Sequence, residues 1–289
     1  MATVLITGTS KGIGLETALA FGRAGHNVLA TMRNPSKAPE LAKAAANEKL
    51  PIIISAMDVD SDQSVTDTVA AMIKERGSID VLVNNAGIER MGSVEELPLS
   101  EFRRVMETNY FGVIRCVQAV APHMRQRRSG FIVNVSSVAG RISSAPMAPY
   151  TASKWALEAL SEALAGEMKM FNIRVAIVEP GIINTAMAQH IRDEVTGSLY
   201  PHPARFNSLF NASLKNPVPP SLVGKRIVEV VESGTWQLRH PVGPDAVPFL
   251  EWRRGMTDEQ WVALNASDNE TWFNNLERDF GLDARPKRG

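Results

Sequence analysis

The chain has little cysteine, little histidine and no long apolar run, and each shortage excludes a class of protein. Cys116 is the single cysteine of 289 residues, which excludes an intrachain disulfide; it lies in an apolar helical pattern that favours a buried thiol. The five histidines show no metal-ligand spacing, so we expect no metal. We find neither a signal peptide in MATVLITG nor a membrane-spanning segment. We therefore expect a cytoplasmic protein without a membrane partner.

The chain also has no excess of charge of either sign. Lysine plus arginine and aspartate plus glutamate number 31 each. Because such a chain has no global basic field, we expect no nucleic-acid partner. Apolar residues make up 44% and charged residues 21%, which is typical of a globular protein with a substantial core.

Short apolar runs alternate with longer stretches of helical periodicity. The runs are nearly continuous in Val, Ile and Leu, which is typical of strands buried on both faces of a parallel sheet. They span residues 3–7, 27–32, 51–57, 79–85, 130–136 and 173–180, with a weaker seventh at 235–240. Helical patterns span 13–24, 35–47, 61–75, 100–127 and 150–170. This alternation predicts an α/β fold, a Rossmann-like doubly wound parallel sheet of about seven strands with helices on both faces.

We interpret residues 1–289 as a single Rossmann-fold domain. Within it, 187–221 is rich in proline and aromatic residues, which predicts a substrate lid, although a poorly ordered loop explains this composition equally well. Residues 242–289 form a tryptophan-rich C-terminal extension. Its short helical patterns could pack on the core or on a second subunit.

The first predicted strand leads into TGTSKGIG, which places Gly8, Gly12 and Gly14 at a strand–helix junction. Gly8 permits a sharp turn, Gly12 lets the backbone approach a phosphate, and Gly14 lets the helix close on the strand. The N-terminus of that helix offers free N–H groups to a pyrophosphate. This arrangement predicts a nucleotide-binding site.

Four further motifs follow at or near later strand ends. NNAG ends in Asn85, Ala86 and Gly87, NVSSVAG contains Ser137, YTASK contains Tyr150 and Lys154, and PGIINT contains Pro180, Gly181 and Thr185. ETNYFG adds Asn109 within a helical pattern. With TGTSKGIG, these motifs resemble those of the short-chain dehydrogenases/reductases, firmly over about residues 3–190. The resemblance implies an oxidoreductase that moves hydride between NADP(H) and a carbonyl or alcohol.

The resemblance implies a catalytic set of Asn109, Ser137, Tyr150 and Lys154. Tyr150 is the general acid in carbonyl reduction and the general base in the reverse direction. Lys154 also binds the ribose hydroxyls, and Asn109 holds a water in a proton relay. Ser137 matches the family's serine, and we expect its neighbour Ser136 to be the one that caps a turn.

Physical reasoning agrees with these roles. Lys154 lies one turn after Tyr150 on the same helix face, so its ammonium can stabilise the phenolate and lower a tyrosine pKa that is ordinarily ~10. The Ser137 hydroxyl can donate to the substrate oxygen, where negative charge builds as hydride arrives.

The cofactor preference is predicted from the end of the second strand. Enzymes that use NAD(H) commonly have an acidic residue there, but LATMRNPS has Arg33 instead, and Lys11 lies in the glycine loop. Two cations would pair with a 2′-phosphate, which predicts NADP(H) over NAD(H), although solvated surface charges are the alternative. Asp58 and Val59 match the family position that contacts adenine. The other expected contacts are Gly8, Ser10, Gly12, Ile13, Gly14, Asn85, Ala86, Gly87, Tyr150, Lys154, Pro180, Gly181 and Thr185.

Two other functions fit parts of the pattern. A non-catalytic NADP(H)-binding sensor or scaffold needs the same fold but not all four catalytic residues. A nucleotide-sugar epimerase or dehydratase usually has a longer chain and a different glycine spacing.

The substrate and the assembly are less defined by the sequence. Ile142, Met147 and Met187 near the expected pocket indicate an apolar small molecule, and VLATMRNPSKAPEL resembles the retinol- or hydroxysteroid-type branch. The resemblance also implies a homodimer or homotetramer formed through the helices that begin near Ser100 and Tyr150.

Overall fold

The fold is built around one parallel sheet. The computed structural model describes residues 1–193 and 197–286. Within them, seven parallel strands pair in the order β3-β2-β1-β4-β5-β6-β7, the order of a doubly wound dinucleotide-binding sheet. The predicted fold class is confirmed. The strands are β1 (Thr3–Thr7), β2 (Asn27–Met32), β3 (Ile52–Ala56), β4 (Val81–Asn84), β5 (Gly130–Val135), β6 (Ile173–Pro180) and β7 (Arg239–Val242).

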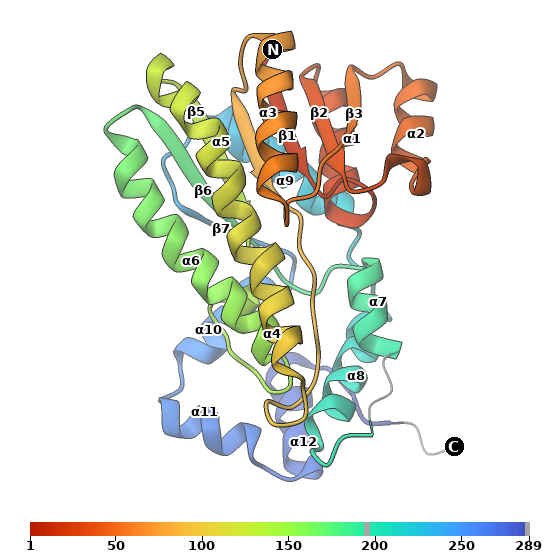
Figure 1. The fold of residues 1–289 in the computed structure, drawn as a ribbon. Coiled ribbons are helices and arrows are strands. Elements are labelled where there is room, and N and C mark those ends of the chain that lie inside the picture. The colour runs from red at the N-terminus through yellow and green to blue at the C-terminus, as the bar shows by residue number, and fades with distance from the viewer. Residues whose placement is uncertain (194–196, 287–289) are drawn as a thin grey trace.

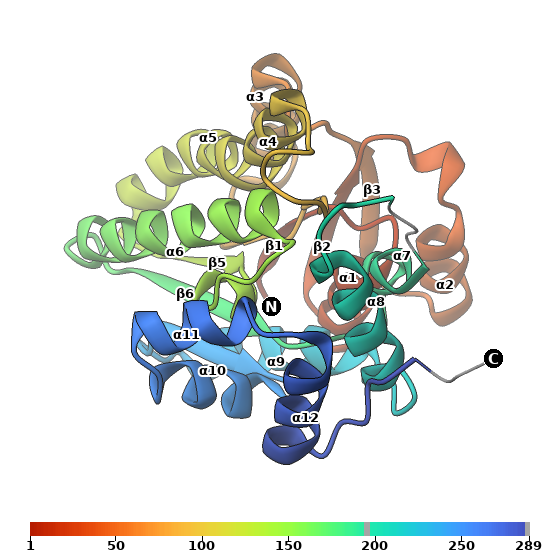
Figure 2. The same cartoon turned by 90° about the horizontal axis from the view of Figure 1, so that it is seen from below.

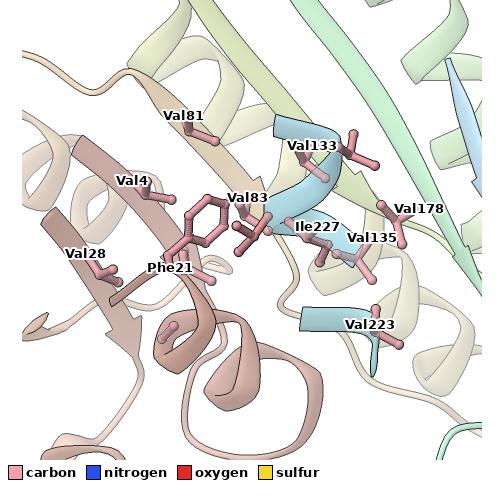
Figure 3. Packing of buried hydrophobic residues seen from close by; sticks show 14 of the residues in the cluster. Val4, Phe21, Val28, Val81, Val83, Val133, Val135, Val178, Val223 and Ile227 are labelled. Carbon is pink, nitrogen blue, oxygen red and sulfur yellow. The ribbon is translucent and has the colours of Figure 1, made fainter. Parts of the chain in front are cut away.

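Helices cover both faces of the sheet (Figure 1). On one face lie α1 (Gly12–Arg23), α2 (Glu40–Glu48) and α9 (Pro220–Ser233), and on the other lie α3 (Asp62–Arg76), α5 (Gly112–Arg127) and α6 (Ala148–Lys169). Figure 3 shows Phe21 of α1 and Ile227 of α9 packed among valines of the central strands. Burial of both faces explains why the strands are almost continuously apolar.

Two of the predicted helices are interrupted. The predicted helix at 100–127 consists of α4 (Leu99–Met106), a π-helical turn (Glu107–Phe111) and α5. The predicted helix at 35–47 starts as a 3₁₀ turn (Pro35–Lys37), and α2 begins after Pro39, which has no N–H for a continuous helix. The seventh strand lies at Arg239–Val242, later than the predicted 235–240.

Five helices gather at the end of the molecule opposite the N-terminus (Figures 1 and 2). They are α7 (Ala186–Asp193), α8 (His202–Ser213), α10 (Ala246–Arg254), α11 (Asp258–Asn265) and α12 (Asn269–Phe280). The C-terminal extension packs on its own chain, since Leu209 of α8 shares a core cluster with Trp272 and Leu276 of α12. The predicted lid at 187–221 includes residues 194–196, which lie outside the described residues, and its role as a lid stays a prediction.

A buried arginine joins α8 to the turn between α11 and α12. Arg205 donates from Nε to Asn269 Oδ1 (2.7 Å) and from Nη2 to the Ser267 carbonyl (2.6 Å). Burial lowers the pKa of this guanidinium. Because a buried donor left unpaired costs free energy, these bonds fix α8 against the C-terminal helices. Across 1–193 and 197–286, no helix has the length and apolar character needed to cross a membrane.

Helices α1 and α9 approach each other to backbone contact at Gly224. A Cβ at this position would lie 2.9 Å from the carbonyl group of Glu16 and from the backbone nitrogen of Thr17. We expect Gly224→Ala to lower the free energy of unfolding by about 1–3 kcal/mol, since a packed interface must separate to admit a methyl group.

Gly166 is the matched control, because a Cβ on this exposed position of α6 would meet nothing within 4 Å. We expect Gly166→Ala to raise the free energy of unfolding by roughly 0.5–1 kcal/mol through helix propensity. Urea unfolding measures both variants. Equal effects of the two substitutions would contradict close packing at Gly224.

Candidate active site

The turn between β1 and α1 is pressed against the chain that leaves β4. Gly8 has a positive φ of 71°, and a Cβ there would lie 2.7 Å from Ala86 Cα. A Cβ at Gly14 would collide with the Gly8 carbonyl oxygen and with Asn85 Nδ2. Gly12 also has a positive φ, 60°, and faces Thr185. At these positions a side chain would distort the turn.

Thr7 and Asn85 hold this turn in place. The Thr7 hydroxyl accepts from the backbone N–H groups of Asn85 and Ala86, both at 3.0 Å. Asn85 Nδ2 donates to the carbonyls of Thr7 (2.9 Å) and Gly8 (3.1 Å). The Asn85 amide therefore shapes the glycine turn. Thr7 was not among the predicted site residues; its signal in the sequence is a hydroxyl residue at the strand end directly before Gly8.

A cavity of about 600 Å³ lies along the ends of β1, β2, β3, β4 and β5. Within the described residues, no side chain caps the first turn of α1, so its N–H groups are available to an anion. The cavity and its glycine turn suit a dinucleotide. The predicted cofactor contacts that line it are Gly8, Ser10, Lys11, Gly12, Ile13, Gly14, Arg33, Asp58, Val59, Asn85, Ala86, Gly87, Tyr150, Lys154 and Thr185.

The predicted contacts Pro180 and Gly181 line a neighbouring cavity instead. Gly181 packs against the side chain of Asp245, which a Cβ would strike. Asp245 Oδ2 also accepts from the Ile182 N–H at 2.7 Å. Asp245, which the sequence analysis missed, therefore fixes the loop after β6.

Arg33 and Lys11 are exposed at the edge of the first cavity. Burial raises the pKa of nearby Asp60, and the charge of Arg33 opposes that rise. Arg33 therefore interacts with the acidic end of β3 as well as with solvent.

Tyr150 and Lys154 stand in the first turns of α6. Lys154 is 5% exposed, its Nζ donates to the Val135 carbonyl (2.8 Å), and it lies 5.7 Å from the centroid of the Tyr150 ring. Burial lowers the pKa of Lys154 to about 8, although the Glu158 carboxylate opposes this. Burial raises the pKa of Tyr150 to about 12, in place of the expected lowering by Lys154, and the hydrogen bond with Ser137 opposes this rise. At neutral pH the tyrosine is therefore a neutral phenol beside a mostly charged lysine.

Ser137 caps a turn and also bonds to Tyr150. Its hydroxyl bonds to Tyr150 and accepts from the Ala139 N–H (3.1 Å), which caps the 3₁₀ turn Val138–Gly140. The expectation that Ser136 caps this turn was wrong, because Ser136 points into the buried space beside Glu158 and Gly140.

Asn109 lies fully buried in the π-helical turn. Its Nδ2 donates to the Ile88 carbonyl (2.8 Å) and to Ser153 Oγ (2.9 Å), and its Oδ1 accepts from the Ile88 N–H (2.8 Å). Asn109 therefore joins the loop after β4 to α6. Gly87 of that loop lies between Asn109 and Lys154, since a Cβ there would be 3.3 Å from Asn109 Oδ1 and 3.8 Å from Lys154 Nζ.

The neighbouring cavity, of about 210 Å³, is largely apolar and shares Tyr150 with the first. Ser137 and the three residues predicted near the pocket, Ile142, Met147 and Met187, line it. The C-terminal extension supplies much of the remaining wall, which the sequence analysis missed. These residues are Phe249 and Trp252 of α10, Trp261 and Leu264 of α11, and Trp272 and Leu276 of α12.

Comparison with known proteins agrees with this geometry. The profile of the family described as short chain dehydrogenase matches residues 2–196. The chain belongs to this family. The predicted family is confirmed, and membership of it supports the predicted enzyme class.

Three similar proteins illustrate the relationship. Retinol dehydrogenase 8 of Bos taurus is 41% identical over 204 residues, which cover 69% of this chain and 64% of that relative's length. A short-chain dehydrogenase from Streptomyces avermitilis is 32% identical, with a TM-score of 0.76 and coverage of 96% of this chain and 97% of the other. A variant of actinorhodin polyketide ketoreductase, solved with NADPH, is 29% identical, with a TM-score of 0.76 and coverage of 85% and 97%.

The Thr7 hydroxyl offers a test of how the glycine turn is held. Thr7→Val keeps the shape but leaves the N–H groups of Asn85 and Ala86 without this acceptor. We expect a loss of about 1–3 kcal/mol in the free energy of unfolding and weaker NADPH binding. Thr7→Ser retains the hydroxyl and should bind NADPH nearly as the wild type does. Equal NADPH affinity of Thr7→Val and the wild type, measured by fluorescence titration, would contradict this role.

Proposed function

We propose that this short-chain dehydrogenase is an NADP(H)-dependent enzyme that interconverts an apolar ketone or aldehyde and its alcohol, with Tyr150 as general acid and base. The observation that carries the proposal is the position of Tyr150 in the wall shared by the two cavities. One cavity suits a dinucleotide and the other an apolar molecule. Ser137 and Lys154 flank the tyrosine.

The cofactor is NADP(H). The glycine turn and the N-terminus of α1 would hold the pyrophosphate, and Arg33 and Lys11 would pair with the 2′-phosphate. Similarity to a ketoreductase solved with NADPH supports this assignment. When bound, the nicotinamide supplies or accepts the hydride.

The side chains of this protein transfer the proton to and from the substrate oxygen. In carbonyl reduction the neutral Tyr150 phenol gives its proton to the substrate oxygen, and the Ser137 hydroxyl donates to the same oxygen as negative charge builds there. The Lys154 ammonium stabilises the phenolate that remains. In alcohol oxidation the phenolate takes the proton back. The pKa of Tyr150, raised to about 12 by burial, keeps the phenol in its donating form at neutral pH.

The substrate is apolar, because aromatic and aliphatic side chains form most of the second cavity. Among the described residues, no charged side chain lines this cavity, so a charged substrate would lose its hydration there without gaining an opposite charge from them. Similarity to retinol dehydrogenase 8 supports a lipid-like alcohol or aldehyde.

Tyr150→Phe tests the proposed acid. The variant keeps the ring and removes the proton, so we expect the rate of NADPH oxidation with apolar ketones and aldehydes to fall by about 10²–10⁴-fold. Tyr110→Phe, a variant of a tyrosine that lines neither cavity, is the control. Retention of most of the rate by Tyr150→Phe would exclude Tyr150 as the acid. Tight NADPH binding by a wild type that reduces no carbonyl would favour a sensor or scaffold.

Arg33→Ala tests the cofactor preference. Loss of a charged partner of the 2′-phosphate should raise the KM for NADPH roughly tenfold or more and leave the KM for NADH nearly unchanged. Lys43→Ala, which removes an exposed cation of α2 away from the cavity, is the control. Equal changes in the KM values for NADPH and NADH would show that Arg33 does not bind the 2′-phosphate.

A further inference from the structure

Beneath Lys154 lies a group of charged side chains that the proposed reaction does not use. Glu158 follows Lys154 by one turn of α6, and Glu179 lies at the end of β6. Their side chains are 5% and 1% exposed. Arg239 of β7 and Arg141, directly after the 3₁₀ turn, reach these carboxylates from the surface. We call these four residues and Glu162 the charge cluster.

Arg239 connects the members of the charge cluster. Its Nε lies 3.0 Å from Glu158 Oε2 and 3.6 Å from Glu179 Oε1, and its Nη2 lies 2.5 Å from Glu162 Oε1. Arg141 Nη1 lies 3.5 Å from Glu179 Oε1. The cluster therefore contains three carboxyl groups and two guanidinium groups. When every group is ionised, one negative charge is left in excess, and Glu158 and Glu179 are the buried carboxylates of the cluster.

Lys154 lies one turn before Glu158 on α6, and the Glu158 charge favours the protonated form of this lysine. Its ammonium donates to the Val135 carbonyl, a neutral acceptor that replaces lost hydration only in part. Residues 154 and 158 are neighbours on one face of α6. Glu158 also packs under the end of β5, because a Cβ at Gly140 would lie 2.7 Å from Ser136 Oγ and 2.9 Å from Glu158 Cγ. The carboxylate thus lies below the strand end to which Lys154 donates.

The two buried carboxyl groups differ in how readily they take up a proton. Burial and the charge of Glu158 raise the pKa of Glu179 to about 7, although Arg141 and Arg239 oppose this. Burial also raises the pKa of Glu158, but the Ser136 hydroxyl and Arg239 oppose that rise. Glu179 is therefore the carboxyl group of the cluster that takes up a proton near neutral pH. Glu158 is the carboxylate next to Lys154 along α6.

We propose that Glu158 is a positioning residue for Lys154: its buried carboxylate supplies the negative charge that keeps the lysine an ammonium ion. Glu158 acts on Lys154 because both side chains are buried and lie one turn apart on α6, whether Glu179 is protonated or ionised. Glu89, after β4, is the charged group that acts on the neighbouring Tyr150. The expected effect of this charge on the rate of carbonyl reduction rests on the proposed function, whereas the charge state of Lys154 does not.

Glu158→Gln removes the charge and keeps the shape of the side chain. Lysine labelled at Cε reports its protonation by NMR, and Lys154→Arg identifies the Lys154 signal. We expect Glu158→Gln to lower the pKa of Lys154 by about one unit or more. Glu162→Gln is the matched control, because it removes an exposed partner of the same arginine and should leave the pKa of Lys154 nearly unchanged.

Arg239→Gln is a second variant, and it should change the pKa of Lys154 in the opposite direction. It removes positive charge and leaves Glu158 in place, so the pKa of Lys154 should rise even where Glu158→Gln does not fold. The proposal is overturned by an unmoved Lys154 signal in folded Glu158→Gln, by an equal shift in Glu162→Gln, or by a fall in Arg239→Gln.

The pH profile of carbonyl reduction provides the kinetic readout. Because the reaction needs a charged Lys154, its alkaline limb should move to lower pH in Glu158→Gln by the shift seen in the NMR titration. A limb that stays in place while the Lys154 signal moves would overturn the claim that this charge serves the reaction. Failure of the wild type to reduce any carbonyl would instead overturn the proposed function, and the NMR titration would still decide the charge state of Lys154.

Discussion

Parallel pairing of β1, β4, β5 and β6 is the constraint on which the site depends. Because these strands run in one direction, the residues that follow them all emerge at one edge of the sheet. Gly8, Asn85, Ser137 and Gly181 come from four distant parts of the sequence and meet there for this reason. The helices between the strands complete the arrangement, since α6 returns Tyr150 and Lys154 to the same edge.

Buried hydrogen bonds then fix the loops at that edge. Thr7, Asn85, Asn109 and Asp245 each satisfy backbone groups of a neighbouring loop. Loops that leave a sheet have backbone groups without ladder partners, and burial makes each unpaired group costly. Several polar residues of the site therefore stabilise the shape of the two cavities. Positions for a cofactor and a substrate follow from that shape.

Charged and apolar surfaces are kept apart around Tyr150. Polar strand ends and exposed cations line one cavity, aromatic side chains of the C-terminal helices line much of the other, and the charge cluster lies beneath. Electrostatic interactions are stronger where water is excluded, so one buried carboxylate can influence Lys154 and, through it, Tyr150. Arg205 anchors the apolar side of this arrangement by joining α8 to the turn before α12.

The sequence by itself determined the parallel sheet and the motifs at its strand ends, because apolar periodicity, glycine positions and short motifs are local properties of the chain. Tertiary structure decided the rest. The contacts of Asn109 in the π-helical turn depend on partners outside its own segment, such as Ile88. The roles of the tryptophan-rich tail and of Glu158 depend on contacts between distant residues, such as Trp261 with Ser143, 118 residues apart, and Arg239 with Glu158, 81 residues apart. No local pattern encodes such a pair, because each partner alone has the appearance of an ordinary surface or core residue.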